Sequence, residues 1–275
     1  MNIGEASASA RVSVVVPTKN AAATLEACLM SIRAQDHSNL ELIVVDNGST
    51  DATVQLALKH ADLVLAAGSE RSAQRNVGIG RATGDWVLWI DADMVLHSDV
   101  VSSALAAAAE ANADAVFIPE ISVGEGFWTA CRALERQCYD GEPFIEAPRL
   151  VRRSYFMMSG GFLEEVAGQE DAELRTRLLR EGRPLARAAS TIVHNEGHLT
   201  LLGVVRKRLY YGKSIPAYSA SSPGAVAQQA RATAAAYVKH RRLLARDPAH
   251  TLGMLFLRSV EAVAYAAGAL RAPGK

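Results

Sequence analysis

Residues 69–94, SERSAQRNVGIGRATGDWVLWIDADM, contain the pattern that decides the fold. A segment with helical character over 71–82 leads through a glycine turn into the apolar run WVLWI, residues 86–90. A short apolar run bounded by turn residues is typical of a buried strand. Asp91 and Asp93 follow at once. The stretch therefore predicts a helix, a buried strand and two carboxylates where the strand ends.

The same alternation extends toward the N-terminus. Apolar runs at 12–16, 41–46 and 63–67 are predicted strands, and helical segments separate them. Pro17 is expected to end the first strand, and Asn20 can cap the helix that follows. The residues that fall on one face of this helix are Leu25, Cys28, Leu29 and Ile32. Strands that alternate with helices favour a mostly parallel sheet with helices on its faces. Ligands bind at the carboxyl ends of the strands in such sheets. Polar residues cluster at these ends, at positions 18–20, 46–50 and 91–93.

Composition excludes several classes of protein. The 275 residues are 49% hydrophobic, which is enough for a sizeable core in one large or two small domains. The 29 basic residues balance the 29 acidic ones, which argues against a general nucleic-acid binder. Three cysteines without a C-x-x-C pattern favour neither disulfides nor zinc and suit a reducing cytosol. The N-terminal sixteen residues do not resemble a secretory signal.

The balanced charge conceals an asymmetry. Residues 201–275 hold twelve basic and two acidic residues, a net charge of +10, whereas residues 1–200 hold 17 and 27, a net charge of −10. The sequence beyond residue 200 is helical and amphipathic in pattern. We therefore predict a compact domain over 11–200 and a basic helical tail over 201–275, with an anionic surface as the partner of the tail.

Two acidic pairs are candidates for chemistry. Asp91 and Asp93 lie on one side of the chain if the backbone stays extended, and two such carboxylates suit a hard divalent cation. The alternative is an ordinary acidic loop. Glu170 and Asp171 open a predicted helix over 169–180, where acids stabilise the first turn. The alternative there is that one of them is a general base.

Three segments together resemble the family 2 glycosyltransferases. They are VSVVVPTKN (12–20), ELIVVDNGSTD (41–51) and residues 69–94, and the resemblance extends over about 11–200. It implies a single nucleotide-sugar-binding α/β domain of the A-type glycosyltransferase fold, with a mostly parallel mixed sheet flanked by helices. It also implies inverting transfer of a sugar from a nucleotide diphosphate donor, with UDP or GDP as the nucleotide, to a hydroxyl acceptor.

The resemblance assigns residues to the nucleotide. The loop after the first strand would border base and ribose, Asp46 would hydrogen-bond the base, and two arginines would lie near the pyrophosphate. The residues concerned are Pro17, Thr18, Lys19, Asp46, Arg71 and Arg75. Asp46 could instead cap a turn, and the arginines could lie on a solvated helix face. Asn47 stands where the family often has a second acid, which leaves the choice of base open.

The resemblance also assigns metal ligands. Asp93 would bind Mn²⁺ or Mg²⁺, and Asp91 would act on the ribose or the metal. His194 would be a further ligand, with a structural or donor-contact role as the alternative and His198 as its substitute.

For catalysis, the resemblance points to a Glu-Asp pair that follows a glycine-rich segment, here SGGF at 159–162. Asp171 is the expected base, with Glu170 as the fallback. Arg149 is expected near the donor or acceptor sugar.

The tail has features that suit a lipid surface. Cations at 206–208 precede Tyr210 and Tyr211, a combination that fits the headgroup region of a membrane. The apolar segment 251–270 is long enough to cross a bilayer, but Arg258 and Glu261 lie in its middle, where they can pair. We therefore favour a helix that lies on the membrane or packs on the catalytic domain, with dimerisation as a further alternative.

A membrane-bound tail would place the protein at the cytoplasmic face of the cell membrane. It would favour a lipid-linked acceptor or a cell-envelope polysaccharide.

Two other functions compete with glycosyl transfer. A nucleotidyltransferase typically needs a glycine-rich basic loop near its N-terminus. Residues 14–27 contain one basic residue, Lys19, and no glycine. A non-catalytic nucleotide-sugar-binding module would not need Asp91, Asp93 and Asp171 together. Both alternatives are therefore less favoured.

Overall fold

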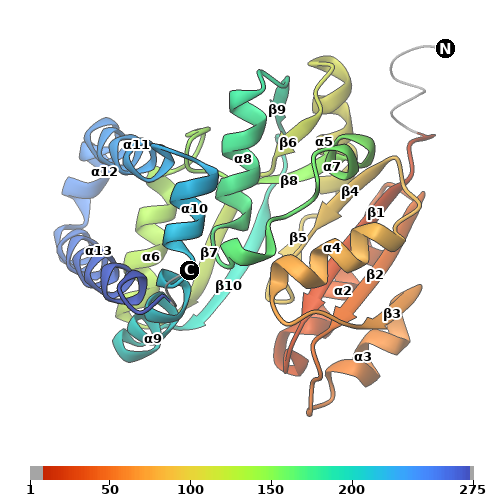
Figure 1. Cartoon of the computed structure of the whole chain (residues 1–275), viewed down its shortest axis with the longest axis horizontal. Helices are drawn as coiled ribbons and strands as arrows, with labels where there is room; N and C mark the ends of the chain where they lie inside the picture. Colours follow the sequence, from red (N-terminus) through yellow and green to blue (C-terminus); the bar gives the residue numbers. More distant parts are fainter. Residues whose placement is uncertain (1–8, 273–275) are drawn as a thin grey trace.

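The computed structural model describes residues 9–272 and consists of a central sheet, a small second sheet and a group of C-terminal helices (Figure 1). The first half of the N-terminal segment tested for a secretory signal, residues 1–8, lies outside the described residues. The central strands are β1 (Val12–Thr18), β2 (Leu40–Asp46), β3 (Leu63–Ala66), β4 (Trp86–Trp89), β6 (Ala115–Phe117), β8 (Pro148–Arg152) and β9 (Leu185–Arg187). Their order is β3-β2-β1-β4-β8-β6-β9.

This sheet is mostly parallel, and only β8 runs antiparallel to both of its neighbours, β4 and β6. The predicted α/β class with a mixed sheet is thereby confirmed.

Helices cover both faces of the sheet. The flanking helices are α2 (Ala22–Arg33), α3 (Thr53–His60), α4 (Arg71–Arg81), α5 (Val100–Glu110), α7 (Arg153–Met158) and α8 (Glu170–Arg180), with a short 3₁₀ turn η1 (Glu164–Val166) before α8. Val14 and Val16 of β1 join the core with α2, α3 and α5, whereas Val15 joins the core with α4, α7 and α8. Because strand side chains alternate between faces, the apolar run of β1 supplies both cores.

Two details after β1 differ from the sequence-based expectation. Pro17 was expected to end the strand, but it lies inside β1 opposite Val45. The proline is tolerated because β4 pairs only with 12–15, so this part of β1 has no neighbour on that side. Asn20 does not cap α2, because it has a φ of 48° and its Oδ1 accepts from the N–H of Thr50, at 2.8 Å. This bond joins the loops that follow β1 and β2.

A three-stranded sheet lies beside the central one. Its strands are β5 (Met94–Leu96), β7 (Glu120–Glu125) and β10 (Ile192–His198), in the order β5-β10-β7. Helix α6 (Phe127–Cys138) packs on β7 and β10. Because β5 follows β4 after only four residues, this sheet begins at the carboxyl edge of the central one.

The described residues beyond 200 are helical, as predicted. They form α9 (Leu201–Gly212), α10 (Ile215–Ser221), α11 (Ala225–Lys239), α12 (Arg241–Arg246) and α13 (Pro248–Ala269). Helix α13 packs against α9 and α6, and the whole group lies on the opposite side of the molecule from α3 (Figure 1). The division into domains at residue 200 stays a prediction.

A buried ion network holds α13 in place. Glu261 is buried and binds Arg132 of α6, Arg208 of α9 at 2.8 Å and Arg258 of its own helix at 3.2 Å. The predicted pairing of Arg258 with Glu261 is thus confirmed. Burial by itself would raise the pKa of Glu261, but the three arginines outweigh burial and lower it. Arg208 is therefore committed to the protein interior and is not free for a lipid headgroup.

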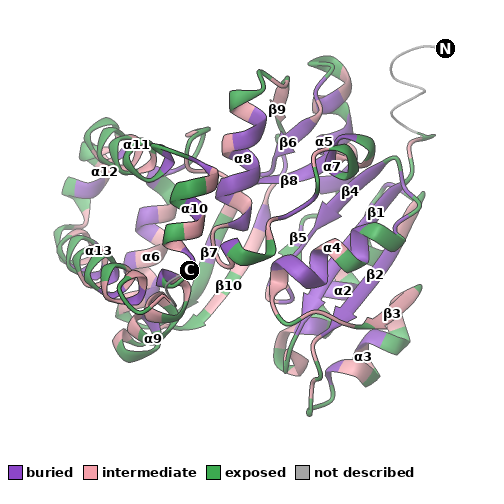
Figure 2. Ribbon diagram, viewed as in Figure 1, coloured by how far each residue is buried: buried purple, intermediate pink, exposed green. Residues whose placement is uncertain are grey.

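The opposite face of α13 is apolar and exposed (Figure 2). Among the described residues α13 is the one helix long and apolar enough to cross a membrane by length and composition. Its exposed large side chains, which we call the α13 apolar face, are Leu252, Leu255, Phe256 and Val263.

Candidate functional site

A buried arginine organises the site. Arg75 lies on α4, three residues before Gly78, where a Cβ would meet Val15 of β1 at 2.5 Å. This close approach of helix to strand leaves the Arg75 side chain with no exposed surface. Its guanidinium donates to Asp91 at 2.6 Å, Asp171 at 3.0 Å and Glu170 at 3.3 Å. Since a buried charge must be paired, Arg75 draws together carboxylates from two distant segments of the chain.

Asp171 has one engaged oxygen and one free oxygen. Its Oδ1 accepts from Arg75 and, at 3.1 Å, from the indole N–H of Trp89 in β4. Its Oδ2 accepts no hydrogen bond from any described residue, and 24% of the side chain is exposed. Glu170 is only 1% exposed, and its Oε1 faces Arg71 and Arg75. Of the two acids, Asp171 is therefore the one that can reach a substrate proton.

Asp91 is surrounded by cations. Besides Arg75, Arg71 lies 3.6 Å and Arg149 3.7 Å from its Oδ2. Burial opposes ionisation, but the arginines outweigh it and hold the pKa of Asp91 well below its usual range. Arg149 also donates twice to Glu120, at 2.8 and 2.7 Å. Asp91 is thus ionised and linked through Arg149 to the second sheet.

Within the described residues, Asp93 makes no ion pair with the arginines of this cluster. The chain turns after β4, with the N–H of Met94 bonded to the carbonyl of Asp91, so the extended backbone expected here does not form. Asp93 Oδ1 is buried and has no hydrogen-bond partner among residues 9–272, and it lies 3.5 Å from Nε2 of His194 in β10. His198 lies further along β10, where it pairs with Glu125 and its ring lies against Gly126.

His194 is an acid–base group in an acidic environment. Its Nδ1 lies 3.7 Å from Glu120 and 3.9 Å from Glu196. Burial favours the neutral ring, but Asp93 and Glu120 outweigh burial and raise the pKa of His194 to about 9. No group of three or more His, Cys, Asp or Glu able to hold a metal occurs within residues 9–272. A cation at Asp93 and His194 would therefore need further ligands from a substrate.

The loops after β1 and β2 are bonded to each other at the same edge of the sheet. Asp46 Oδ1 accepts from Thr18 Oγ1 at 2.9 Å, and its Oδ2 accepts from the N–H of Ser49 at 2.8 Å. The turn-capping interpretation of Asp46 is thereby confirmed, while its contact with a base stays a prediction. Pro17 is buried within β1, and Lys19 is exposed on the loop that follows it.

Sequence reasoning missed two contacts of the site. Trp89 was seen only as an apolar strand residue, although a buried indole N–H needs an acceptor and this was an available signal. Glu120 gave no signal, because its partners Arg149 and Arg136 become neighbours only through the fold.

Arg71 lies where a ligand can reach it. Its side chain is 36% exposed, and its guanidinium carbon lies 5.8 Å from the centre of the Tyr211 ring in α9. Tyr211 packs against Gly168 and is partly buried, while its expected place among lipid headgroups stays a prediction. Its neighbour Tyr210 donates to Glu70.

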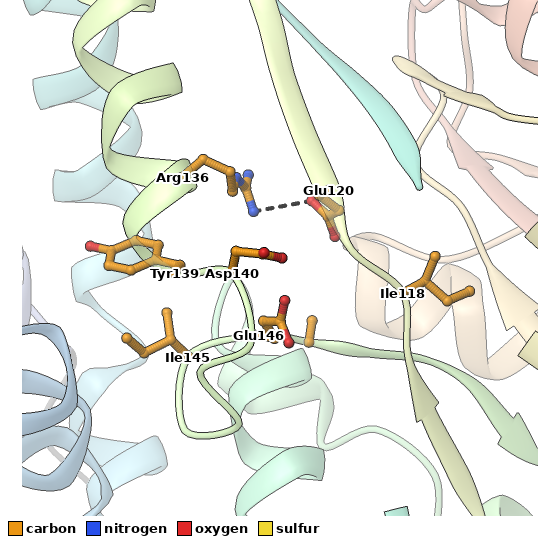
Figure 3. Close-up of a pocket in the computed structure, with 8 residues that line it drawn as sticks. Ile118, Glu120, Arg136, Tyr139, Asp140, Ile145 and Glu146 are labelled. Carbon is orange, nitrogen blue, oxygen red and sulfur yellow. Dashed lines mark ion pairs between the residues drawn. The ribbon is translucent and has the colours of Figure 1, made fainter. Parts of the chain in front are cut away.

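A hollow adjoins the cluster at Glu120. Figure 3 shows Arg136 and Glu120 joined by an ion pair, with Tyr139, Asp140 and Glu146 nearby. These residues line a small cavity of about 40 Å³. A second cavity of about 470 Å³ shares three of these residues, Glu120, Arg136 and Asp140, and extends between β7 and α6. Its volume falls within the range of small-molecule sites.

Comparisons with known proteins agree with this arrangement. Residues 13–160 match the family described as Glycosyl transferase family 2. A PGL/p-HBAD biosynthesis glycosyltransferase of Mycobacterium tuberculosis is 38% identical over 92 residues, which cover 31% of this chain and 36% of that protein. The chain thus matches about a third of the length of this relative.

Two solved structures share the fold. The mannosyltransferase PcManGT from Pyrobaculum calidifontis, in complex with GDP-Man and Mn²⁺, has a TM-score of 0.62 at 22% identity and covers 95% of this chain and 87% of its own. TarS 1-349 of S. aureus, in complex with UDP-GlcNAc, has a TM-score of 0.56 at 17% identity, with coverages of 94% and 90%. At these identities the likeness shows the fold alone.

The central role of Arg75 predicts a large loss of stability on its removal. In Arg75→Met, Asp171 and Glu170 would lose a buried cation, and the free energy of unfolding should fall by about 3–5 kcal/mol. Urea unfolding followed by circular dichroism measures this. The control is Arg81→Met at the exposed end of the same helix, which should change stability by less than about 0.5 kcal/mol. Equal stabilities of the two variants would contradict the role given to Arg75.

Proposed function

Since the chain belongs to glycosyl transferase family 2, we propose that it is an inverting glycosyltransferase that moves a sugar from a nucleotide diphosphate-sugar to a hydroxyl acceptor. One observation carries this: Asp171 has one oxygen fixed by Arg75 and Trp89 and the other free, beside the carboxyl edge of the sheet. The complexes of structural neighbours with UDP-GlcNAc and GDP-Man support UDP or GDP as the nucleotide.

The proposed reaction is a single displacement. The acceptor oxygen attacks the anomeric carbon while Asp171 Oδ2 takes its proton. The bond between that carbon and the phosphate oxygen breaks, and its electron pair leaves with the nucleotide diphosphate. Attack opposite the leaving group inverts the anomeric configuration. The fixed Oδ1 holds the carboxylate in one orientation, so little rotational freedom is lost when the acceptor binds.

The cations of the site divide into two roles. Arg71 is exposed, and we assign it to the diphosphate. Arg75 has no exposed surface, so we assign it to the carboxylates in place of the nucleotide contact expected from the sequence. Thr18, Lys19 and Asp46, with Pro17 behind them, would border base and ribose.

The residues at Asp93 fit a divalent cation. The partnerless Oδ1 of Asp93 faces an imidazole nitrogen of His194, and a donor diphosphate would add the oxygen ligands that Mn²⁺ or Mg²⁺ prefers. Such an ion, when bound, neutralises charge on the leaving diphosphate. The Mn²⁺ in the PcManGT complex supports this assignment.

The proposal is tested by a hydrolysis screen. Wild-type protein with Mn²⁺ or Mg²⁺ should release UDP from a UDP-sugar or GDP from a GDP-sugar, and excess chelator should stop the release. Asp93→Ala should lose at least about 100-fold in rate while keeping the wild-type melting temperature. Asp85→Ala, on the exposed loop before β4, is the control. Full activity of Asp93→Ala, or of the wild type in chelator, would contradict the metal assignment.

A second prediction separates catalysis from binding. Asp171→Asn keeps the acceptor oxygen for Arg75 and Trp89 but cannot take a proton, so turnover should fall at least about 100-fold. The dissociation constant for UDP or GDP should stay within about twofold of wild type. Turnover near the wild-type value would remove Asp171 as the base and point to Glu170.

We further propose that the tail binds an anionic membrane through the α13 apolar face. The four side chains of this face are exposed, and α13 carries exposed positions along its length in Figure 2. Three arginines, Arg241, Arg242 and Arg246, lie on α12 just before α13. An apolar helix face flanked by cations is typical of a helix that lies in the lipid interface. Glu261 and Arg258 lie on its inner side and stay bound to the protein. The acceptor would then be lipid-linked, and the protein would act at the cytoplasmic face of the membrane.

Sedimentation with liposomes tests this surface. Binding should need anionic lipid and weaken with salt, since each nearby cation contributes about 1 kcal/mol. Phe256→Ser with Val263→Ser should reduce the bound fraction strongly. The control is Leu58→Ser with Met158→Ser, two exposed apolar residues far from α13 in the sequence. Protein that stays in the supernatant at low salt and forms a dimer through α13 would contradict the membrane proposal.

A further inference from the structure

The segment just before the acidic pair is held by the C-terminal helices. Residues 167–169 connect η1 to α8, and Gln169 is the N-cap residue of α8, two positions before Asp171. Gly168 has a φ of 77°, and a Cβ there would meet the Tyr211 ring at 2.5 Å. Only glycine allows both this backbone conformation and this close approach.

Two hydrogen bonds anchor the residues on either side of Gly168. The hydroxyl of Ser214, at the start of α10, lies 2.7 Å from the carbonyl oxygen of Ala167 and 2.7 Å from that of Tyr211, so it bridges the two residues. Gln169 Nε2 donates to the hydroxyl of Tyr265 in α13 at 3.1 Å, and Arg208 donates to the same hydroxyl at 2.9 Å. The start of α8 is therefore bonded to α10 and α13 directly and to α9 through Arg208.

The anchoring helices form a firm support. At Gly212 and Gly268, helices α9 and α13 touch so closely that a Cβ on Gly268 would lie 2.4 Å from the carbonyl oxygen of Leu209. Arg208 also binds Glu261, so the Tyr265 hydroxyl is part of a buried polar network rather than a free side chain. A hydrogen bond to such a group fixes position better than one to a mobile surface residue.

We infer that Ser214 and Tyr265 are positioning residues of the proposed reaction, which fix the start of α8 and so direct Asp171 Oδ2 at the acceptor. The inference rests on the proposed function. Arg75 and Trp89 restrain the carboxylate of Asp171. Ser214 instead holds the backbone carbonyl of Ala167, and Tyr265 holds the side chain of Gln169, so both act on the segment that leads into Asp171. Misplacement of a reacting group by about 1 Å can cost about 100-fold in rate. The tail thus contributes to catalysis on a soluble acceptor as well as on a lipid-linked one.

The test is the double variant Ser214→Ala with Tyr265→Phe. Each change removes a hydroxyl and leaves the rest of the side chain in place. The matched control is Ser221→Ala with Tyr155→Phe: Ser221 makes only the local bond to Tyr218, and Tyr155 bonds Glu181. For each protein one measures the turnover of the donor found in the screen, the dissociation constant of its free nucleotide, the melting temperature, and amide hydrogen exchange over residues 167–173.

The inference predicts at least about a tenfold fall in kcat, with the nucleotide dissociation constant within about twofold and faster exchange over 167–173. The control should match wild type in kcat, in the nucleotide dissociation constant and in hydrogen exchange. The single variant Ser214→Thr keeps a hydroxyl at this position, so its kcat should stay near the wild-type value. Unchanged kcat or unchanged exchange in the double variant would overturn the inference, as would an equal loss in the control. If the double variant fails to fold, the two single changes are measured and judged by the same criteria.

A wild type without turnover on any donor would contradict the proposed function, and with it the catalytic part of this inference. The exchange measurement would still decide whether the two hydroxyls anchor the start of α8.

Discussion

A single buried cation imposes the geometry on which the site depends. Arg75 has no contact with solvent, and its positive charge is tolerable only if carboxylates surround it. Asp91 lies just after the end of β4, and Glu170 and Asp171 lie at the start of α8, about eighty residues later in the sequence. Their meeting at Arg75 holds α8 against α4 and the sheet. It also places a free carboxylate oxygen at the carboxyl edge of the sheet, where the loops after β1 and β2 lie.

Much of the fold follows from local pattern. The apolar runs and their spacing predicted the first four strands and the helices between them, because a buried strand consists of consecutive apolar residues that can be recognised in the sequence. The predicted inward face of α2, with Leu25, Leu29 and Ile32, is buried as expected. Pro17 and Asn20 were misassigned, because the end of β4 and the loop after β2 decide their conformations. Neither neighbour can be identified from the adjacent sequence.

The candidate site was predicted as a set of residues but not as a set of contacts. Asp91, Arg75 and Asp171 do come together, whereas Asp93 pairs with His194 instead of Arg75. The tail shows the same limit. Its charge and apolar length suggested a lipid surface, yet Arg208 and Tyr211 are used inside the protein. Composition reveals which charges are present, but only the fold reveals which of them already have partners.

The central claim is that Trp89 and Arg75 act by holding Asp171 ready to accept a proton. The most direct measurement is kcat in four proteins: wild type, Trp89→Phe, Asp171→Asn and the double variant. If Trp89 acts through Asp171, Trp89→Phe should lower kcat about tenfold in the wild type and not at all in the Asp171→Asn background. An equal loss in both backgrounds would show that Trp89 acts independently of Asp171 and would contradict the account.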